Sequence, residues 1–249
     1  MTPKVKIVLG KVDEYFGLLD CIFLQDYEFK EECLSCYDGL KKLLDNSENK
    51  EDELRKYFKT IEKNEYKKLN NLTRNLKKLW EPINDKIIKA FEEIHEIKWT
   101  EKHKVFIARM VICPISPRYL NYNAFDIAIN ESEKELLDTI LHELSPFIFF
   151  EKFKQIYPNT NPEHFESPHL IWKLSEIMPG IILQDKRIQK IFPNKELSVY
   201  DSIKKLKLNN KLILKTFKEF YDNKKDFTGF VKKSYEFMQK HKEEINKRF

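Results

Sequence analysis

The sequence predicts an α+β fold that is predominantly helical. Apolar residues recur every three or four positions through most of the 249 residues, which is the spacing of helices with one buried face. Three short segments, at residues 4–9, 104–113 and 125–130, are instead rich in β-branched or alternating apolar residues, as strands are. The chain has only 5 glycines but 19 phenylalanines and 11 tyrosines, so we expect a well-packed core rather than a loop-rich chain.

The first part of the chain, residues 1–98, is predicted to be mostly helical. Residues 4–9 (KVKIVL) form a short strand signal, and helical spacing of apolar residues begins at Val12. The same spacing resumes at Leu54 and is interrupted by Pro82. Such a stripe could contact a coiled-coil partner, although packing within the same domain is its commoner cause. We therefore expect an N-terminal region 1–98 and a second region 99–249, as two domains or one continuous domain.

The second region begins with a predicted pair of strands. Residues 104–113 (KVFIARMVIC) and 125–130 (FDIAIN) have strand character, and prolines and asparagines between them indicate a loop. The sequence Ser132-Glu-Lys-Glu135 is a capping-box pattern and predicts the start of a helix. A further helix is expected from Ser167-Pro168 to Pro179-Gly180, and residues 185–249 are predicted to be helical.

The most informative motif lies in the helix predicted behind Ser132. His142-Glu143-Leu-Ser-Pro146 has the form of the zinc-protease motif H-E-x-x-H with proline in place of the second histidine. In that motif two imidazoles four residues apart share a zinc ion, and the glutamate acts as general base toward the metal-bound water. Here the first imidazole and the glutamate are present and the second imidazole is missing.

The order of strand, loop, strand, His-Glu helix and a later helix with a glutamate resembles the zincin metallopeptidases, and within them the gluzincins. The resemblance covers roughly residues 104–180 and implies a small sheet with an edge strand, an active-site helix and a glutamate helix. It implies that His142 and Glu176 are zinc ligands and that Glu143 is the general base. It also implies that residues 125–130 are the edge strand, to which an extended peptide substrate adds.

Pro146 is the main departure from the family pattern. Proline has no metal-binding atom, and inside a helix it removes a backbone hydrogen bond and favours a kink at a cost of about 3 kcal/mol. A catalytic zinc ion usually has three protein ligands, so His142 and Glu176 alone should hold zinc weakly. His169, two helical turns before Glu176, is the candidate third ligand, and Asp138 and His164 are alternatives. Equally, His169 is interpreted as a polar residue of a first helical turn or as a hydrogen-bond donor on the substrate side.

Other features of the sequence carry less information. The dipeptide His95-Glu96 repeats the His-Glu pair without supporting context, so the pair at 142–143 could also be an ordinary hydrogen-bonding pair on a helix. Three tyrosines are candidates for an oxyanion donor in an active relative: Tyr119, Tyr122 and Tyr200. The Cys33-x-x-Cys36 spacing has no second pair beside it and is not a complete zinc knuckle.

Composition bounds the possible partners and location. The net charge of +5 is mild, and no concentrated basic stretch with interleaved aromatic residues occurs, so no nucleic-acid partner is expected. No secretory signal or membrane-length apolar segment is present, and 4 cysteines do not form a disulfide framework, so a cytoplasmic protein without a membrane partner is expected.

These observations predict a metallopeptidase-like protein with a degenerate zinc site, in which peptide hydrolysis is doubtful. One alternative is a catalytically inactive zincin-fold module that binds a peptide or protein. The other is an unrelated helical interaction protein whose His-Glu pair is accidental. The sequence does not indicate the substrate, the partner or the oligomeric state.

Overall fold

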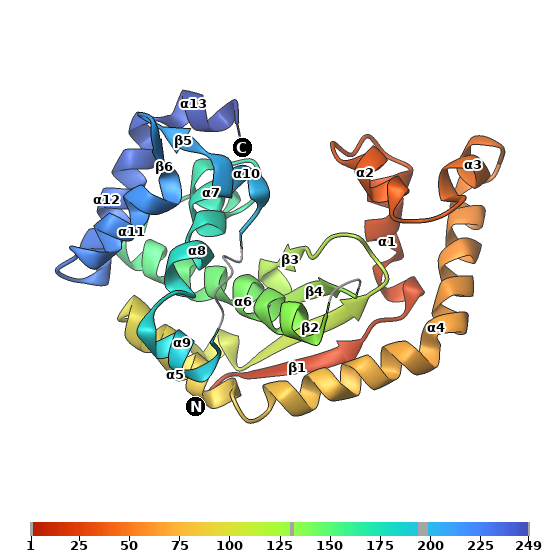
Figure 1. The fold of residues 1–249 in the computed structure, drawn as a ribbon, viewed down its shortest axis with the longest axis horizontal. Coiled ribbons are helices and arrows are strands. Elements are labelled where there is room, and N and C mark those ends of the chain that lie inside the picture. The colour runs from red at the N-terminus through yellow and green to blue at the C-terminus, as the bar shows by residue number, and fades with distance from the viewer. Residues whose placement is uncertain (1, 130–131, 194–198, 249) are drawn as a thin grey trace. The chain divides into compact units, whose positions relative to one another are not determined.

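The computed structural model describes residues 2–129, 132–193 and 199–248 (Figure 1). It confirms the predicted α+β class with helices predominating. The chain divides into two compact units that do not follow its order: a sheet unit of residues 5–82 and 105–137, and a helical unit of residues 1–4, 83–104 and 138–249. The sequence suggested a boundary at residue 98, but residues 83–104 all belong to the helical unit. Whether residues 1–98 and 99–249 fold as separate domains stays a prediction.

The sheet unit contains a four-stranded sheet whose order is β1-β2-β4-β3 (Figure 1). Strand β2 runs parallel to β4, with Arg109 opposite Asp126, whereas β3 runs antiparallel to β4, with Tyr119 opposite Ala124. Both long strands predicted near residues 104–113 and 125–130 are confirmed. The strands are β1 (Lys4–Leu9), β2 (Val105–Val111), β3 (Arg118–Tyr119) and β4 (Ala124–Ala128).

The predicted edge strand is wrong. Strand β4 covers most of residues 125–130, and it pairs with β2 on one side and β3 on the other. Asn130 lies outside the described residues. A peptide cannot add to β4, because the backbone hydrogen-bonding groups on both of its sides already belong to the sheet. The edge on this side is the two-residue strand β3, which lies in the segment where the sequence predicted only a loop.

Helices of the sheet unit arise from amphipathic segments that bury one stripe each. Helix α4 buries Leu54, Phe58, Leu69, Leu76 and Trp80 within the protein, which accounts for the apolar stripe without a coiled-coil partner. It ends at Trp80, just before the proline that interrupts the pattern in the sequence. The helices are α1 (Val12–Phe23), α2 (Lys30–Ser35), α3 (Leu40–Asp45) and α4 (Lys50–Trp80), with the 3₁₀ turn η2 (Leu120–Tyr122).

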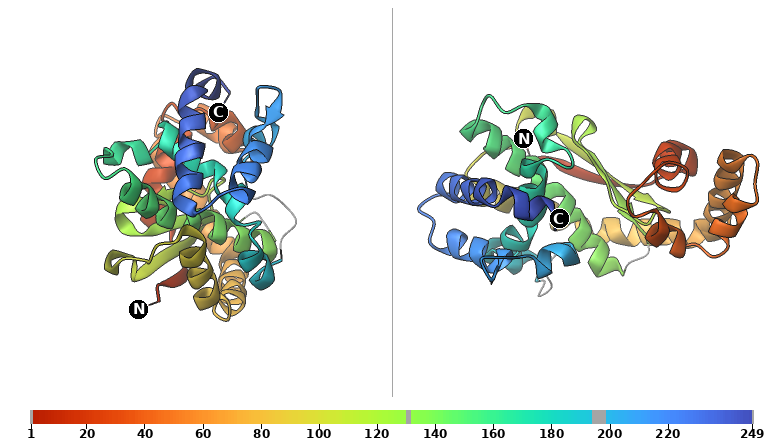
Figure 2. Two further views of the ribbon diagram at one scale, coloured as in Figure 1. Left: turned by 90° about the vertical axis from the view of Figure 1, so that its left-hand side faces the viewer. Right: turned by 90° about the horizontal axis from the view of Figure 1, so that it is seen from above.

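The helical unit surrounds a core rich in aromatic side chains, including Phe149, Phe153 and Phe165. Within it, α7 packs against α12, and α11 packs against α8 and α12 (Figure 2). Its elements are α5 (Asn84–His95), η1 (Glu101–His103), α6 (Glu133–Ile156, from Asp138 onward), η3 (Pro162–Phe165), α7 (Leu170–Ile177), α8 (Pro179–Ile182), α9 (Lys186–Ile191), α10 (Asp201–Lys205), α11 (Ile213–Asp222), α12 (Phe227–Lys240) and α13 (Lys242–Asn246).

Two local details of this unit differ from the sequence prediction. A hairpin of β5 (Lys207–Leu208) and β6 (Lys211–Leu212) interrupts the C-terminal segment that was expected to be wholly helical. Its turn residues Asn209 and Asn210 both have positive φ, a conformation that asparagine adopts more readily than most residues. The helix expected from Ser167 begins at Leu170, after a cis peptide bond before Pro168. Among the described helices, none combines the length and the apolar character needed to cross a membrane.

Candidate functional site

Helix α6 carries the predicted motif, and its start follows from a reciprocal cap. The backbone N–H of Ser132 donates to Glu135 Oε2 at 2.7 Å, and the backbone N–H of Glu135 donates to Ser132 Oγ at 3.4 Å. This is the capping box that the sequence predicted, and it satisfies two backbone donors at the helix start. The motif therefore lies on a helix whose register is set within its first turn.

The middle of α6 is buried on every side. All residues from 140 to 150 are buried, so this part of the helix lies in the core rather than on a surface. His142 and Glu143 are 7% and 5% exposed, and polar groups at such positions need hydrogen-bond or charge partners inside the protein. Burial of this pair does not fit a solvated helix face.

Pro146 lies within α6, and the helix continues through it from Glu133 to Ile156. Because proline has no N–H, the residue at position 146 cannot donate the helical hydrogen bond to the carbonyl of His142. Helix α6 therefore lacks this one backbone hydrogen bond in the turn that contains His142.

Helix α7 supplies the second half of the site. It packs against α12 and buries Glu176, which is 2% exposed. Its buried Lys173 donates from Nζ to Asn246 Oδ1 at 2.9 Å, so the polar residues of α7 are fixed by neighbours in the same unit. Glu176 thus lies on a short helix that packs against α12 and forms a hydrogen bond to Asn246 through Lys173.

The structure brings His142, Glu143 and Glu176 together. Nε2 of His142 lies 3.3 Å from Glu176 Oε2 and 3.9 Å from Glu143 Oε1. Two residues separated by 34 positions in the chain therefore meet inside the helical unit. Two buried carboxylates beside one imidazole favour a positive charge between them, which either a proton on His142 or a bound cation can supply.

His169 does not join this cluster. It is exposed and forms the N-cap of α7, and its ring centre lies 4.9 Å from the ring centre of His164. The assignment of His169 as a third ligand stays a prediction, and the geometry pairs it with His164 instead.

Of the three tyrosines considered as donors, Tyr200 contacts the cluster. Its ring lies edge-on to His142 with 6.2 Å between ring centres, and the side chain is 53% exposed. Tyr119 instead donates its hydroxyl to Asp126 in the sheet unit, and Tyr122 is exposed in that unit. Tyr200 thus lies between the buried imidazole and solvent.

Sequence reasoning missed Ser145. Its Oγ is buried and has no hydrogen-bond partner among the residues that the structure describes, and it lies three residues after His142 on α6, where side chains of a helix are neighbours. A buried hydroxyl without a partner often marks a place for a water molecule or ion. The only signal for it in the sequence was its position inside the motif.

The spacing of the donors matches part of a zinc site. Two ligands on one tetrahedral zinc ion, with bonds of about 2.0 to 2.2 Å, lie roughly 3.3 to 3.5 Å apart. The separation of 3.3 Å between His142 Nε2 and Glu176 Oε2 falls at this value. However, in the described ranges no group of three or more His, Cys, Asp or Glu side chains has the arrangement of a metal site. These residues do not complete the centre that the resemblance implies.

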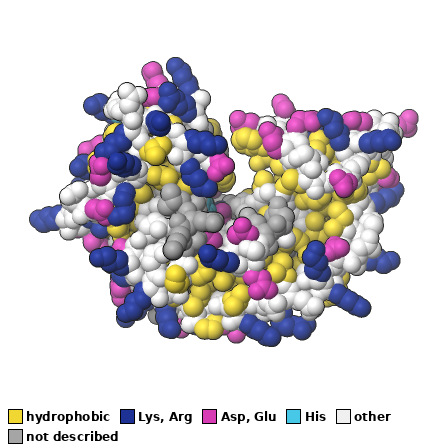
Figure 3. Space-filling model, viewed as in Figure 1, with side chains coloured by type: hydrophobic (Ala, Val, Ile, Leu, Met, Phe, Trp, Pro, Cys, Tyr) yellow, Lys and Arg dark blue, Asp and Glu magenta, His cyan; other side chains and the backbone are white. Residues whose placement is uncertain are grey.

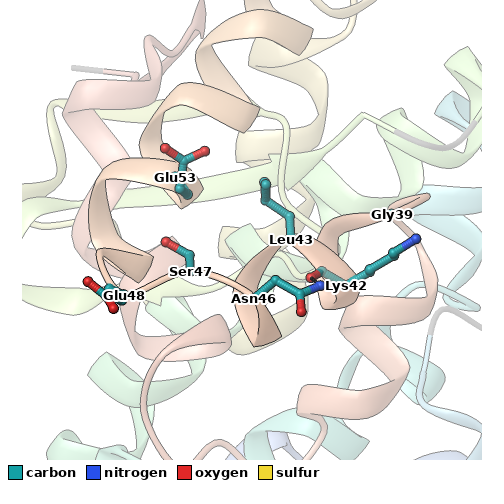
Figure 4. A pocket seen from close by; sticks show the side chains of 7 residues that line it. All are labelled: Gly39, Lys42, Leu43, Asn46, Ser47, Glu48 and Glu53. Atoms are coloured by element: carbon teal, nitrogen blue, oxygen red, sulfur yellow. Dashed lines mark hydrogen bonds between the residues drawn. The ribbon is translucent and has the colours of Figure 1, made fainter.

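A surface hollow of about 680 Å³ lies in the sheet unit, bordered by α3, the connection that follows it and the start of α4 (Figure 4). Its charged residues are Lys42, Glu48 and Glu53, and Glu53 is already paired with Lys56. None of the predicted site residues lines this hollow, which gives no reason to place the motif chemistry there.

Comparison with protein-family models, with curated protein sequences and with solved structures gives no match for this chain.

Proposed function

We propose that this chain is a metallopeptidase-like protein of zincin-like build whose zinc site is degenerate and whose principal role is not peptide hydrolysis. The observation that supports this most directly is the meeting of His142, Glu143 and Glu176 in the core of the helical unit, at 3.3 and 3.9 Å from one imidazole nitrogen. An accidental His-Glu pair gives no reason for a carboxylate 34 residues away to approach the same atom.

The loss of hydrolysis follows from the donor set. Pro146 occupies the position of the second imidazole, and a peptidase needs three protein ligands that hold the metal and leave a position open for water. With two such ligands the metal is held weakly. If zinc binds, His142 and Glu176 are the residues that hold it, and Glu143 stands beside them as the residue that the family uses as a base. The role of His142 as a ligand requires its Nε2 to be free of a proton.

A peptide- or protein-binding role is the second candidate, and the sheet topology favours it. Among the described strands, β3 pairs with β4 alone and is the last strand on that side of the sheet. An extended segment can add to such an edge by main-chain hydrogen bonds, without any metal. The proposed site for an added peptide strand is therefore β3, residues 118–119, in place of residues 125–130.

Metal analysis of purified protein tests the proposal, with Pro146→His as the informative variant and Pro146→Ala as its control. Both variants remove the proline from α6, but only the histidine adds a donor one turn from His142. We expect Pro146→His to bind zinc at least about tenfold more tightly than Pro146→Ala. Adding His142→Ala to the histidine variant should abolish this gain.

Equal zinc binding by the His and Ala variants would overturn the proposed kinship with zincins and leave the unrelated helical interaction protein. Stoichiometric tight zinc in the unaltered protein, together with peptide cleavage that a chelator stops, would overturn the proposal that the site is degenerate.

A further inference from the structure

The second half of α4, in the sheet unit, presents an exposed basic face that is separate from the His142 cluster. Three cations nearer the start of the same helix are paired: Arg55 and Lys59 with Asp13 at 2.9 Å, and Lys56 with Glu53 at 2.8 Å. Farther along, Lys68 pairs with Glu65. Five other exposed cations between residues 63 and 78 form no ion pair with any residue that the structure describes: Lys63, Lys67, Arg74, Lys77 and Lys78.

Helical geometry places these five side chains on one side of α4. At about 100° per residue they fall within a sector of roughly 100°, opposite the buried stripe that includes Leu69 and Trp80. From Lys63 to Lys78 the row is about 22 Å long, at 1.5 Å per residue. Figure 3 shows Lys and Arg side chains along the lower margin of the molecule, where Figure 1 draws α4. We call these five residues the α4 basic row.

The other side chains beside the row are polar. Asn64 and Asn71 are exposed on its flank, and Tyr66 is 54% exposed at its margin. Lys63 and Tyr66 also line a hollow of about 480 Å³ together with Lys11, the N-cap residue of α1, and the acidic Glu62. The one acidic residue in register with the row is Glu81, at the helix C-cap. Leu79, the exposed aliphatic residue of this half, lies about 100° away from the nearest cation of the row.

We propose that the α4 basic row binds the phosphate backbone of a nucleic-acid duplex without reading its sequence. A duplex carries one negative charge for about every 1.7 Å of axis, so about 13 phosphates surround a length of about 22 Å, and those on one side are enough to meet the five cations. Lysine, arginine, asparagine and tyrosine are the side chains that donate to phosphate and sugar oxygens.

Two other anionic partners fit the row less well. A membrane surface would call for large apolar side chains among the cations, and the row has none. An acidic protein would call for an apolar centre within the interface, which the row also lacks. The basic residues are separated by Asn, Leu and Glu along the chain, which is why the sequence predicted no nucleic-acid partner. Only the helix brings them into line, and the proposal revises that expectation.

The test is fluorescence anisotropy of the full chain with a labelled duplex of about 20 base pairs, over a salt range of about 50 to 200 mM. We expect binding whose logarithmic salt dependence has a slope of about −4, as four to five phosphate contacts give. The variant Lys63→Gln, Lys67→Gln, Arg74→Gln, Lys78→Gln should lose at least about tenfold in affinity at low salt and have a slope near −1.

The control variant removes the same charge elsewhere: Lys225→Gln, Lys232→Gln, Lys240→Gln and Lys242→Gln change exposed lysines of the helical unit. It should keep the affinity and the slope of the unaltered protein. Thermal unfolding by circular dichroism establishes that both variants are folded.

No duplex binding at low salt would overturn the proposal, and so would equal losses in the two quadruple variants. Binding of phosphatidylserine vesicles or of polyglutamate with the same affinity and the same dependence on the row would also overturn it in favour of those partners.

Discussion

Nε2 of His142 on α6 lies 3.3 Å from Oε2 of Glu176 on α7, in the interior of the helical unit. This relationship joins the two parts of the motif that the sequence could only suggest separately. It also couples the site to stability, because both side chains are buried and each is a partner of the other. A site of this kind can be tested through folding as well as through metal binding.

Substitution of Glu176 should reveal this coupling. Glu176→Ala leaves the buried imidazole without this acceptor and opens a cavity, so we expect a loss of about 2–4 kcal/mol in the free energy of unfolding. Glu176→Gln keeps an oxygen acceptor and should cost less, about 1–2 kcal/mol. Urea unfolding of both variants, combined with His142→Ala in a double-mutant cycle, gives the coupling energy. A value near zero would mean that the contact contributes nothing to stability.

Two other buried histidines predict a pH dependence of stability. Burial lowers the pKa of His95 to about 3 and the pKa of His103 to about 4, against 6.5 for a free imidazole. At pH values between these lowered pKa values and 6.5, both rings therefore stay neutral in the folded state, while the same rings bind protons in the unfolded chain. The stability that they contribute is fully present above pH 6.5 and is lost as the pH falls below it. The contribution of these two histidines to the slope of the unfolding free energy against pH should approach about 2.7 kcal/mol per pH unit near pH 5, because the unfolded chain binds two more protons.

The variant His95→Leu isolates one of these protons. His95 packs on Phe227 with 4.6 Å between ring centres, and its Nδ1 lies 2.9 Å from the carbonyl oxygen of Phe91. Leucine keeps most of the packing and removes the titration. Between pH 6.5 and 5 its unfolding free energy should vary less steeply than that of the unaltered protein, by up to about 1.4 kcal/mol per pH unit. Parallel curves would contradict a neutral buried His95.

A hydrogen-bond network across three strands should stabilise the sheet unit. Asp126 on β4 is 1% exposed and accepts from Arg109 on β2 at 2.7 and 3.0 Å and from the hydroxyl of Tyr119 on β3 at 2.9 Å. Asp126→Asn should cost about 2–4 kcal/mol, since it removes the charge that balances Arg109. Tyr119→Phe removes one bond and should cost about 1 kcal/mol. Chemical denaturation measures both, and equal costs would contradict the dominance of the ion pair.

The capping box at the start of α6 should contribute a smaller amount. Ser132→Ala removes the acceptor for the backbone N–H of Glu135, and a loss of about 0.5–2 kcal/mol is expected. Ser132→Thr keeps a hydroxyl and should lose less. Thermal unfolding compares them, and an alanine variant as stable as the threonine variant would show that the cap does not stabilise the protein.

Local features of the fold could be predicted from the sequence because their causes are local. The Ser132–Glu135 cap, the end of α4 before Pro82 and the β-branched run of β2 each depend on residues within a few positions of one another. The hairpin at Asn209-Asn210 was missed, although its turn residues were a usable signal. Strand β3 was missed because two residues give no periodicity.

The position of β4 in the sheet could not be predicted in the same way. Its alternating residues predict a strand, but the same pattern fits an edge strand and an interior one. Strand β4 is interior because the two-residue strand β3, which lies in the connection between β2 and β4, pairs with its second side. The polar Asp126 is compatible with that place because Arg109 and Tyr119 satisfy its oxygens.

By itself the sequence predicted the strands β1, β2 and β4 and the amphipathic helices α4 and α6, and it showed that position 146 carries no metal donor, since these follow from side-chain chemistry and short-range spacing. Only the tertiary structure decided that Glu176 reaches His142 and that His169 lies beside His164. Those outcomes depend on how α6 and α7 pack, which is set by the fit of many apolar side chains at once and has no signature in any short stretch of the chain.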